Sequence, residues 1–271
     1  MKVGALLFAT EDTISGPSLI PELESRGLDS LFLAEHSHMP KSTDRELPRM
    51  YYEAMDPFVY LATAATVPSS VLLGTGICLI VQRDPIQTAK LVASLDVVSN
   101  GRFVLGIGAG WNEEEMANHG TTDPARRFKL MRERVEAMQV IWRDEVPEFS
   151  SEFVNFGPME AWPKPKQKPN PPVLVGGTYP GAFNRAFRYA DGWLPRSDVP
   201  ELPERIREFK DKAAAAGGRH TVTVLLLDPT EAEIYAEAGA DRIIMGIPSR
   251  GAEKVLPVLD RYADIAQRVA G

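Results

Sequence analysis

The stretch NGRFVLGIGAGW, residues 100–111, decides how this chain is expected to fold. It opens with an Asn-Gly turn dipeptide, and residues 103–107 continue it as a short apolar run typical of a strand covered on both faces. Glycine then occupies every second position, which lets another group come close to the backbone. These glycines are Gly106, Gly108 and Gly110.

The glycines have two interpretations that the pattern alone supports about equally. They can serve only to turn the chain from the strand into the next helix, or they can bring the backbone against a flat or anionic ligand. A Rossmann fingerprint is disfavoured, because its third glycine comes three residues after the second, whereas Gly110 follows Gly108 by two.

The composition is that of an ordinary globular protein, with 271 residues of which 44% are hydrophobic and 25% charged. The net charge of −7 argues against a nucleic-acid or anionic-membrane partner, because such surfaces need basic patches. A single cysteine, Cys78, excludes an internal disulfide and a cysteine-rich zinc site. The first residues, MKVGALLF, are too soon polar for a signal peptide, and we expect a cytoplasmic protein.

Strand and helix patterns alternate along the chain on either side of the opening stretch. Strands are predicted at residues 3–8, 30–34, 72–81, 103–107, 173–175, 192–194, 222–227 and 242–245. Helices are predicted at residues 17–26, 57–67, 85–99, 125–142, 181–190, 201–216, 230–237 and 252–269. Such alternation indicates parallel strands with right-handed crossovers, and it predicts one α/β domain over 1–271, a (β/α)8 TIM barrel. A doubly wound open sheet is the alternative.

Two longer connections interrupt this alternation. Residues 35–56, after the second strand, are polar and without periodicity, and a loop of this length in a compact domain is usually functional or disordered. Residues 145–172, before the fifth strand, are rich in proline and lysine, and their end, WPKPKQKPNPP (162–172), is predicted to form an extended, exposed linker.

Glu35 and His36 follow the second strand directly, where a barrel places its chemistry. Imidazole is the side chain whose charge changes near neutral pH, so catalytic and structural roles for His36 are about equally supported. Metal binding is disfavoured, because no spacing of Asp, Glu or His around His36 and His38 matches a metal site. The other two histidines, His119 and His220, are expected at the surface.

Two further segments follow predicted strands. Residues 176–178, Gly-Gly-Thr, offer backbone N–H groups and a hydroxyl that suit a phosphate, although a plain tight turn explains them nearly as well. Asn112 and the acidic run 113–115 are interpreted as a helix N-cap with a first turn that complements the helix dipole, in preference to catalysis. A nucleophile elbow, a P-loop and the H-E-x-x-H pattern are absent from the sequence, which disfavours hydrolases.

Residues 72–115, LLGTGICLIVQRDPIQTAKLVASLDVVSNGRFVLGIGAGWNEEE, strongly resemble the luciferase-like monooxygenase family. In that family LGTG, an R-x-P helix start and LDxxSxGRxxLGxGxGWxxxE recur in this order. The segments PNPPVLVGG, AFRYADGWLP and AGADRIIMGIP extend the similarity over nearly the whole chain. The compact length and the C-terminal pattern resemble most the branch that uses coenzyme F420, a deazaflavin.

The resemblance implies a barrel that holds a flavin or deazaflavin across the C-terminal strand ends. Glu35-His36 stands where many deazaflavin members have Asp-His, which implies catalytic roles for both, with the histidine near the reactive ring carbon and the acid orienting the imidazole. The longer acid, glutamate, is a departure from that pattern. Gly76-Ile77 matches a bulge under the central ring, and we predict that their peptide bond is cis. The resemblance implies that four consecutive residues flank the cofactor ring: Gly108, Ala109, Gly110 and Trp111. It implies that the backbone of four others binds the cofactor phosphate: Val175, Gly176, Gly177 and Thr178.

These observations predict an oxidoreductase that binds reduced coenzyme F420 and transfers hydride to a small organic acceptor, with His36 as proton donor or charge stabiliser. One alternative within the family is a two-component monooxygenase that uses reduced FMN and oxygen. Another, which the glycines alone permit, is a barrel that binds a phosphorylated ligand without redox chemistry. The resemblance also favours a homodimer.

Overall fold

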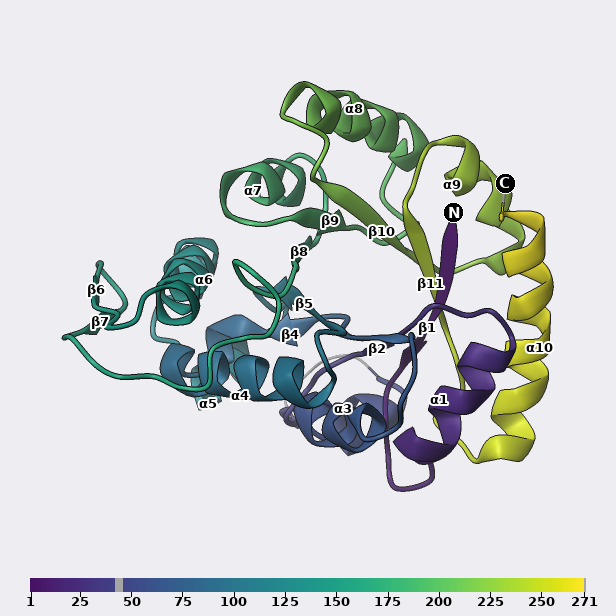
Figure 1. Cartoon of the computed structure of the whole chain (residues 1–271), viewed down its shortest axis with the longest axis horizontal. Helices are drawn as coiled ribbons and strands as arrows, with labels where there is room; N and C mark the ends of the chain where they lie inside the picture. Colours follow the sequence, from purple (N-terminus) through teal and green to yellow (C-terminus); the bar gives the residue numbers. More distant parts are fainter. Residues whose placement is uncertain (42–45, 271) are drawn as a thin grey trace.

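The computed structural model describes residues 1–41 and 46–270, and in it parallel strands close into a barrel (Figure 1). The strands are β1 (Lys2–Leu7), β2 (Ser30–Leu33), β3 (Leu72–Thr75), β4 (Cys78–Leu79), β5 (Phe103–Gly108), β8 (Val173–Gly176), β9 (Gly192–Leu194), β10 (Thr221–Leu226) and β11 (Arg242–Gly246). The barrel has eight strand positions, one of which is shared by β3 and β4, since both pair with β5. β1 pairs with β11 and β3 pairs with β5, so the sheet has no free edge between them. The predicted TIM barrel is therefore confirmed, and the open sheet is wrong.

Helices surround the barrel on its outside (Figure 1). They are α1 (Gly16–Ser25), α3 (Pro57–Ala65), α4 (Pro85–Val98), α6 (Arg127–Arg143), α7 (Gly181–Tyr189), α8 (Leu202–Ala215), α9 (Ala232–Glu237) and α10 (Ala252–Arg268), with the short α2 (Met50–Glu53) and α5 (Glu113–Asn118) at the mouth. Local chemistry starts several of them: Asp84 caps α4 by accepting the Gln87 N–H, and Pro85 takes the first position.

The apolar core has two layers. The larger one lies between strands and helices, and a smaller one fills the barrel with Leu6, Phe32, Val104, Leu174, Leu194 and Ile244. A Cβ at Gly74 would lie 2.5 Å from Cε1 of Phe32, so glycine at this position leaves room for the largest ring inside the barrel. The packed interior places any ligand site at a barrel end.

The prediction of one continuous third strand over residues 72–81 is wrong. The chain leaves the ladder at Gly76 and Ile77, re-enters it as β4 beside β5, and then forms a 3-10 turn over Ile80–Gln82. The Gly76–Ile77 peptide bond is cis, as predicted. The bulge that the family resemblance predicts at Gly76-Ile77 is the point where the ladder breaks, and the half-buried Gly76 and Ile77 interrupt an otherwise buried run.

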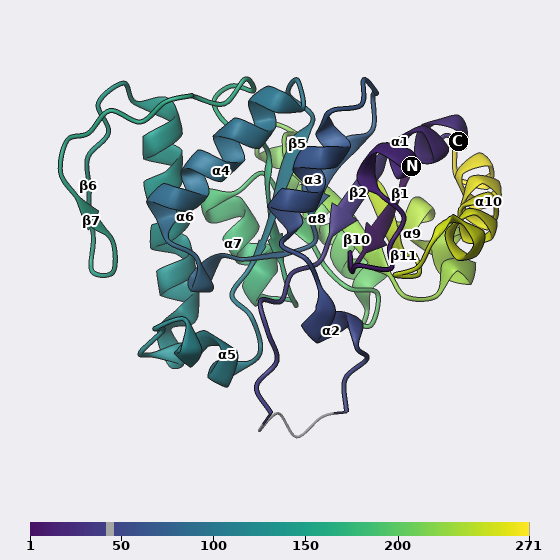
Figure 2. The ribbon, with the colours of Figure 1, turned by 90° about the horizontal axis from the view of Figure 1, so that it is seen from below.

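The connection 145–172 is already structured before its predicted linker, residues 162–172, begins. It contains an antiparallel hairpin of β6 (Phe149–Ser150) and β7 (Asn155–Phe156), which projects beyond the barrel (Figure 2). Its later part is anchored, since Lys164 Nζ donates to the Ile141 carbonyl over 2.7 Å. The lysine that suggested a solvated linker instead satisfies a carbonyl at the end of α6.

The loop 35–56 contains the short helix α2. The sequence alone did not predict this helix, because the loop has no hydrophobic periodicity. Its residues 42–45 lie outside the described residues, as does position 271 of the predicted domain. Within the described part of the chain, no helix combines the length and apolarity needed to cross a membrane.

Candidate active site

The predicted site residues lie at or just after the C-terminal ends of parallel strands, with Val175 and Gly176 as the last two positions of β8. Glu35 and His36 come after β2, the Gly76-Ile77 bulge after β3, and Gly177 and Thr178 after β8. Residues 108–111 begin at the last position of β5. Because the strands are parallel and closed, their ends surround a single barrel mouth.

Ile77 joins three of these strand ends by packing into space that two glycines leave. A Cβ at Gly108 would lie 2.5 Å from Ile77 Cδ1, and a Cβ at Gly176 would lie 2.9 Å from Ile77 Cγ2. Glycine at these two positions therefore admits the Ile77 side chain. The result is an apolar platform held by β4, β5 and β8, of a kind that can support a flat ring.

His36 is buried, with 8% of its surface exposed, and its Nδ1 lies 2.9 Å from Oε2 of Glu115. The other carboxylate oxygen of Glu115 accepts the Ser37 N–H over 3.1 Å. Asn112 caps α5 by accepting the Glu115 N–H over 3.0 Å, which holds this first turn against the loop after β2. His36 and Glu115 thus form one buried pair at the mouth.

Glu115 is the site residue that the sequence analysis did not single out. The acidic run does occupy the first turn of α5, as predicted, but Glu113 and Glu114 are exposed while Glu115 is 1% exposed. The available signal was the motif GWxxxE, whose last residue is Glu115. A helix-dipole role does not explain why this residue alone turns inward.

The charge state of this pair follows from its hydrogen bonds. Burial acts to raise the pKa of Glu115, but hydrogen bonds from His36, Gln82 and the Ser37 backbone outweigh burial and hold that pKa below its usual range. The carboxylate is therefore ionised near neutral pH. An ionised carboxylate can only accept a hydrogen bond, so Nδ1 of His36 must carry the proton that it donates to Glu115. The free ring nitrogen, Nε2, is then the atom of His36 that can give or take a proton.

Glu35 makes a different set of contacts. Its Oε2 accepts the Leu79 N–H over 2.8 Å, and its Oε1 accepts Nε of Arg83 over 2.6 Å. Arg83 also pairs with Asp56 and lies over the Phe58 ring. Both oxygens of Glu35 thus hold the chain just after the Ile77 bulge, and the carboxylate on the imidazole is that of Glu115.

Aromatic rings surround His36. The Tyr51 ring centroid lies 5.4 Å from the imidazole and 4.9 Å from the Phe8 ring. The Trp111 ring meets the imidazole edge-on at 5.9 Å and is 43% exposed. Trp111 is therefore placed to contact a ligand at the mouth as well as the histidine.

The turn after β8 is open to solvent. Gly177 and Thr178 are exposed just before α7, and Gly177 has a φ of 123°, a conformation that favours glycine. The Gly177 carbonyl accepts Nε1 of Trp193 over 2.9 Å, which fixes the turn. An exposed turn at a helix start fits a cofactor phosphate, and the Ile77 platform fits its ring. Arg196 pairs with Asp198, so its guanidinium is already engaged.

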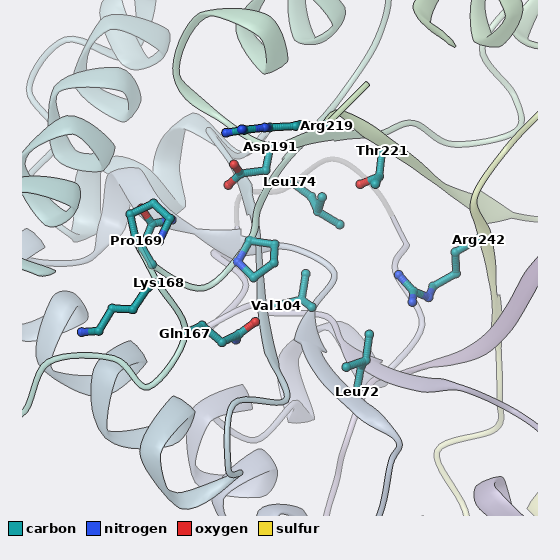
Figure 3. A pocket seen from close by; sticks show the side chains of 12 residues that line it. Leu72, Val104, Gln167, Lys168, Pro169, Leu174, Asp191, Arg219, Thr221 and Arg242 are labelled. Carbon is teal, nitrogen blue, oxygen red and sulfur yellow. The ribbon is translucent and has the colours of Figure 1, made fainter. Parts of the chain in front are cut away.

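A cavity of about 360 Å³ lies at the other end of the barrel (Figure 3). Strand-start residues such as Leu72, Thr221 and Arg242 line it. Two of the charged side chains that line it are engaged in contacts within the fold: Arg242 forms a bidentate pair with Asp29, and Asp191 accepts the Val173 N–H. The lining of this cavity includes neither His36 nor the glycines after the strands, which lie at the C-terminal strand ends where barrel enzymes hold their active sites.

Comparison with known proteins agrees with this geometry. Residues 17–268 match the model of the luciferase-like monooxygenase family. A protein of Mycobacterium tuberculosis described as uncharacterised is 36% identical, over 97% of this chain and 98% of its own. The F420-dependent hydroxymycolic acid dehydrogenase of the same species is 28% identical, over 85% of this chain and 68% of its own. The FMNH2-dependent dimethylsulfone monooxygenase of Pseudomonas putida is 27% identical, over 52% and 39%.

Solved structures share the fold. An F420-dependent secondary alcohol dehydrogenase superposes with a TM-score of 0.78 at 17% identity, covering 99% of this chain and 98% of its own. The monooxygenase RslO1 from Streptomyces bottropensis superposes with a TM-score of 0.77 at 20% identity, covering all of both chains. The family match and the 36% identical relative confirm the resemblance found in the sequence. The chain belongs to the luciferase-like monooxygenase family and is an oxidoreductase of that family.

Proposed function

We propose that this protein binds reduced coenzyme F420 at the barrel mouth and catalyses hydride transfer to a small organic acceptor. The observation that carries the proposal is the buried His36–Glu115 pair, which leaves Nε2 of the imidazole available at the barrel mouth that also carries the Ile77 platform. Two deazaflavin-dependent enzymes among the relatives and neighbours support this choice of cofactor.

Each residue would have a defined task. Ile77 supports the cofactor ring, and the Gly177-Thr178 turn takes its phosphate. When bound, the cofactor supplies the hydride. Nε2 of His36 donates a proton to the acceptor as its negative charge develops, and Glu115 stabilises the resulting imidazole in the tautomer with Nδ1 protonated.

Glu35 would act as a positioning residue. It is nearly buried and holds both the Leu79 N–H and Arg83, so it fixes the path of the chain after Ile77. Glutamate in place of the aspartate that many deazaflavin members have at this position supplies one more methylene. That length lets one carboxylate span both partners.

A reduced-FMN-dependent monooxygenase is the second candidate, because flavin-dependent relatives also match this chain. Titration of the apoprotein with F420 and with FMN, followed by fluorescence, separates the two. We expect a Kd for F420 at least about tenfold lower, a difference of about 1.4 kcal/mol in binding free energy. Tighter FMN binding with oxygen-dependent product formation would transfer the assignment to the monooxygenase. Absence of redox turnover with either cofactor would point to a binding protein.

The proposal includes a homodimer formed through α3 and α4, which lie side by side (Figure 1). Val59 on α3 is 64% exposed and Val97 on α4 is 45% exposed, so both helices carry apolar side chains that a second copy of the chain would cover. Size-exclusion chromatography with light scattering tests this. A dimer that Val59→Glu converts to monomer supports it, and a monomer for the unmodified chain contradicts it.

A further inference from the structure

Two further histidines, His38 and His119, lie on the other side of Ser37 from the His36–Glu115 pair. The proposed reaction does not use them. The Ser37 hydroxyl lies 2.8 Å from Nδ1 of His38 and 2.6 Å from Nε2 of His119. The same hydroxyl lies 3.4 Å from Oε1 of Glu115. Ser37 therefore touches the buried pair on one side and two solvent-accessible imidazoles on the other.

Counting protons gives the direction of each hydrogen bond. A serine hydroxyl has one proton to donate, so it can donate to only one of its three neighbours. Asn118 Nδ2 lies 2.8 Å from Nε2 of His38 and donates to it, which puts the His38 proton on Nδ1, facing Ser37. With both imidazoles neutral, Ser37 accepts from His38 and donates to Nε2 of His119.

Protonation of His119 changes this arrangement. Its Nε2 becomes a donor, and the Ser37 oxygen then accepts from both imidazoles. The hydroxyl proton has one remaining acceptor among these neighbours, Oε1 of Glu115. The ionised Glu115 carboxylate gains a donor and holds the proton on His36 less strongly.

We propose that Ser37 links the solvent-exposed His119 to the buried His36–Glu115 pair, so that protonation of His119 turns the Ser37 hydroxyl toward Glu115 and makes His36 harder to protonate. Ser37 and His119 are thus positioning residues that set the pH range in which His36 can donate a proton. The catalytic consequence rests on the proposed function, whereas the link itself is a property of the protein without cofactor.

The titratable groups in contact with Ser37 or the buried pair include His38, Tyr51 and His119. Glu114 lies beside Glu115 in the first turn of α5. Glu113, on the same turn of α5 as Glu115, lies 3.9 Å from Arg127. The coupling is therefore expected mainly among the three histidines and Glu115.

The test uses histidine-labelled apoprotein and follows the Cε1–H resonances by NMR as the pH is changed. The chain has four histidines, so substitution of each one assigns the spectrum. His119→Gln keeps a neutral hydrogen-bonding group and removes the charge. We expect it to move the His36 transition to higher pH by about half a unit. The matched control is His220→Gln, because His220 packs against Phe187 and Phe209 instead.

A double-mutant cycle with Ser37→Ala distinguishes the link from direct charge repulsion. If the hydroxyl carries the coupling, His119→Gln moves the His36 transition by less than about 0.1 unit in the Ser37→Ala background. Ser37→Thr, which keeps the hydroxyl, should restore the larger shift. An equal shift with and without the hydroxyl, or no shift in either background, would overturn the proposal. These readouts need no cofactor, so they remain valid if the proposed hydride transfer is wrong.

Discussion

Nδ1 of His36 lies 2.9 Å from Oε2 of Glu115, although 79 positions separate the two residues in the chain. The strand before His36 is β2 and the strand before Glu115 is β5, and both end at the same mouth. The contact joins a loop to the first turn of a short helix, and it leaves Nε2 of His36 as the nitrogen available for chemistry.

Replacement of His36 by alanine should lower turnover by roughly 100- to 10,000-fold, the usual contribution of a positioned proton donor. Cofactor affinity should stay within about tenfold, because the phosphate turn at Gly177 and the Ile77 platform are untouched. Steady-state kinetics and a binding titration measure the two effects separately. Unchanged turnover with the natural acceptor would make His36 a structural residue.

Glu115→Gln keeps the size of the side chain and removes its charge. Turnover should fall by at least about tenfold, because the amide stabilises a charged imidazole less well. Glu113→Gln is the matched control on the same turn, where the side chain is exposed, and it should leave turnover within about twofold. Equal effects of the two substitutions would show that the pairing with His36 has no catalytic role.

The lowered pKa of Glu115 predicts how its contribution to stability depends on pH. A carboxyl group whose pKa is lower in the folded state than its ordinary value of 4.5 stabilises the protein above that value. This contribution is lost as the pH falls through the folded-state pKa. Urea unfolding should therefore give a difference between the unmodified protein and Glu115→Gln that shrinks as the pH falls below about pH 4.5. A difference independent of pH down to about pH 3 would contradict this.

Glu35→Gln should destabilise the protein by about 1–3 kcal/mol, because it leaves the partly buried Arg83 with Asp56 as its one remaining charged partner among the described residues. Glu35→Asp should also destabilise, since the shorter side chain cannot reach both Leu79 and Arg83. Urea denaturation measures both. A turnover loss with no change in stability would instead give Glu35 a direct part in the reaction.

Gly108→Ala should weaken cofactor binding more than it weakens the fold. The added Cβ meets the flexible end of Ile77, 2.5 Å away, so the side chain can move at a cost of about 1–2 kcal/mol. That movement tilts the platform under the ring, and we expect a loss of affinity of about tenfold. The double variant Gly108→Ala with Ile77→Ala removes the clash but also the platform, and it should not recover affinity. Full recovery would indicate that Ile77 is not part of the cofactor site.

Several features could be predicted from sequence because the information is local. Alternating strand and helix patterns, Asp84-Pro85 at a helix start and glycines after strands each follow from a few neighbouring residues. The closed barrel follows from that alternation, since parallel strands with short crossovers permit few topologies. Position after a strand was also sufficient to place Glu35, His36 and Gly177 at one end.

The partners of those residues were decided only by the tertiary structure. Sequence neighbours suggested that Glu35 would act with His36, whereas the fold directs Glu35 to Leu79 and Arg83 and brings in Glu115. A hydrogen bond depends on distances of a few tenths of an ångström between side chains, and these distances are set by barrel closure and by the Asn112 cap on α5. The sequence determined which residues reach the mouth, and packing between distant segments determined which of them touch.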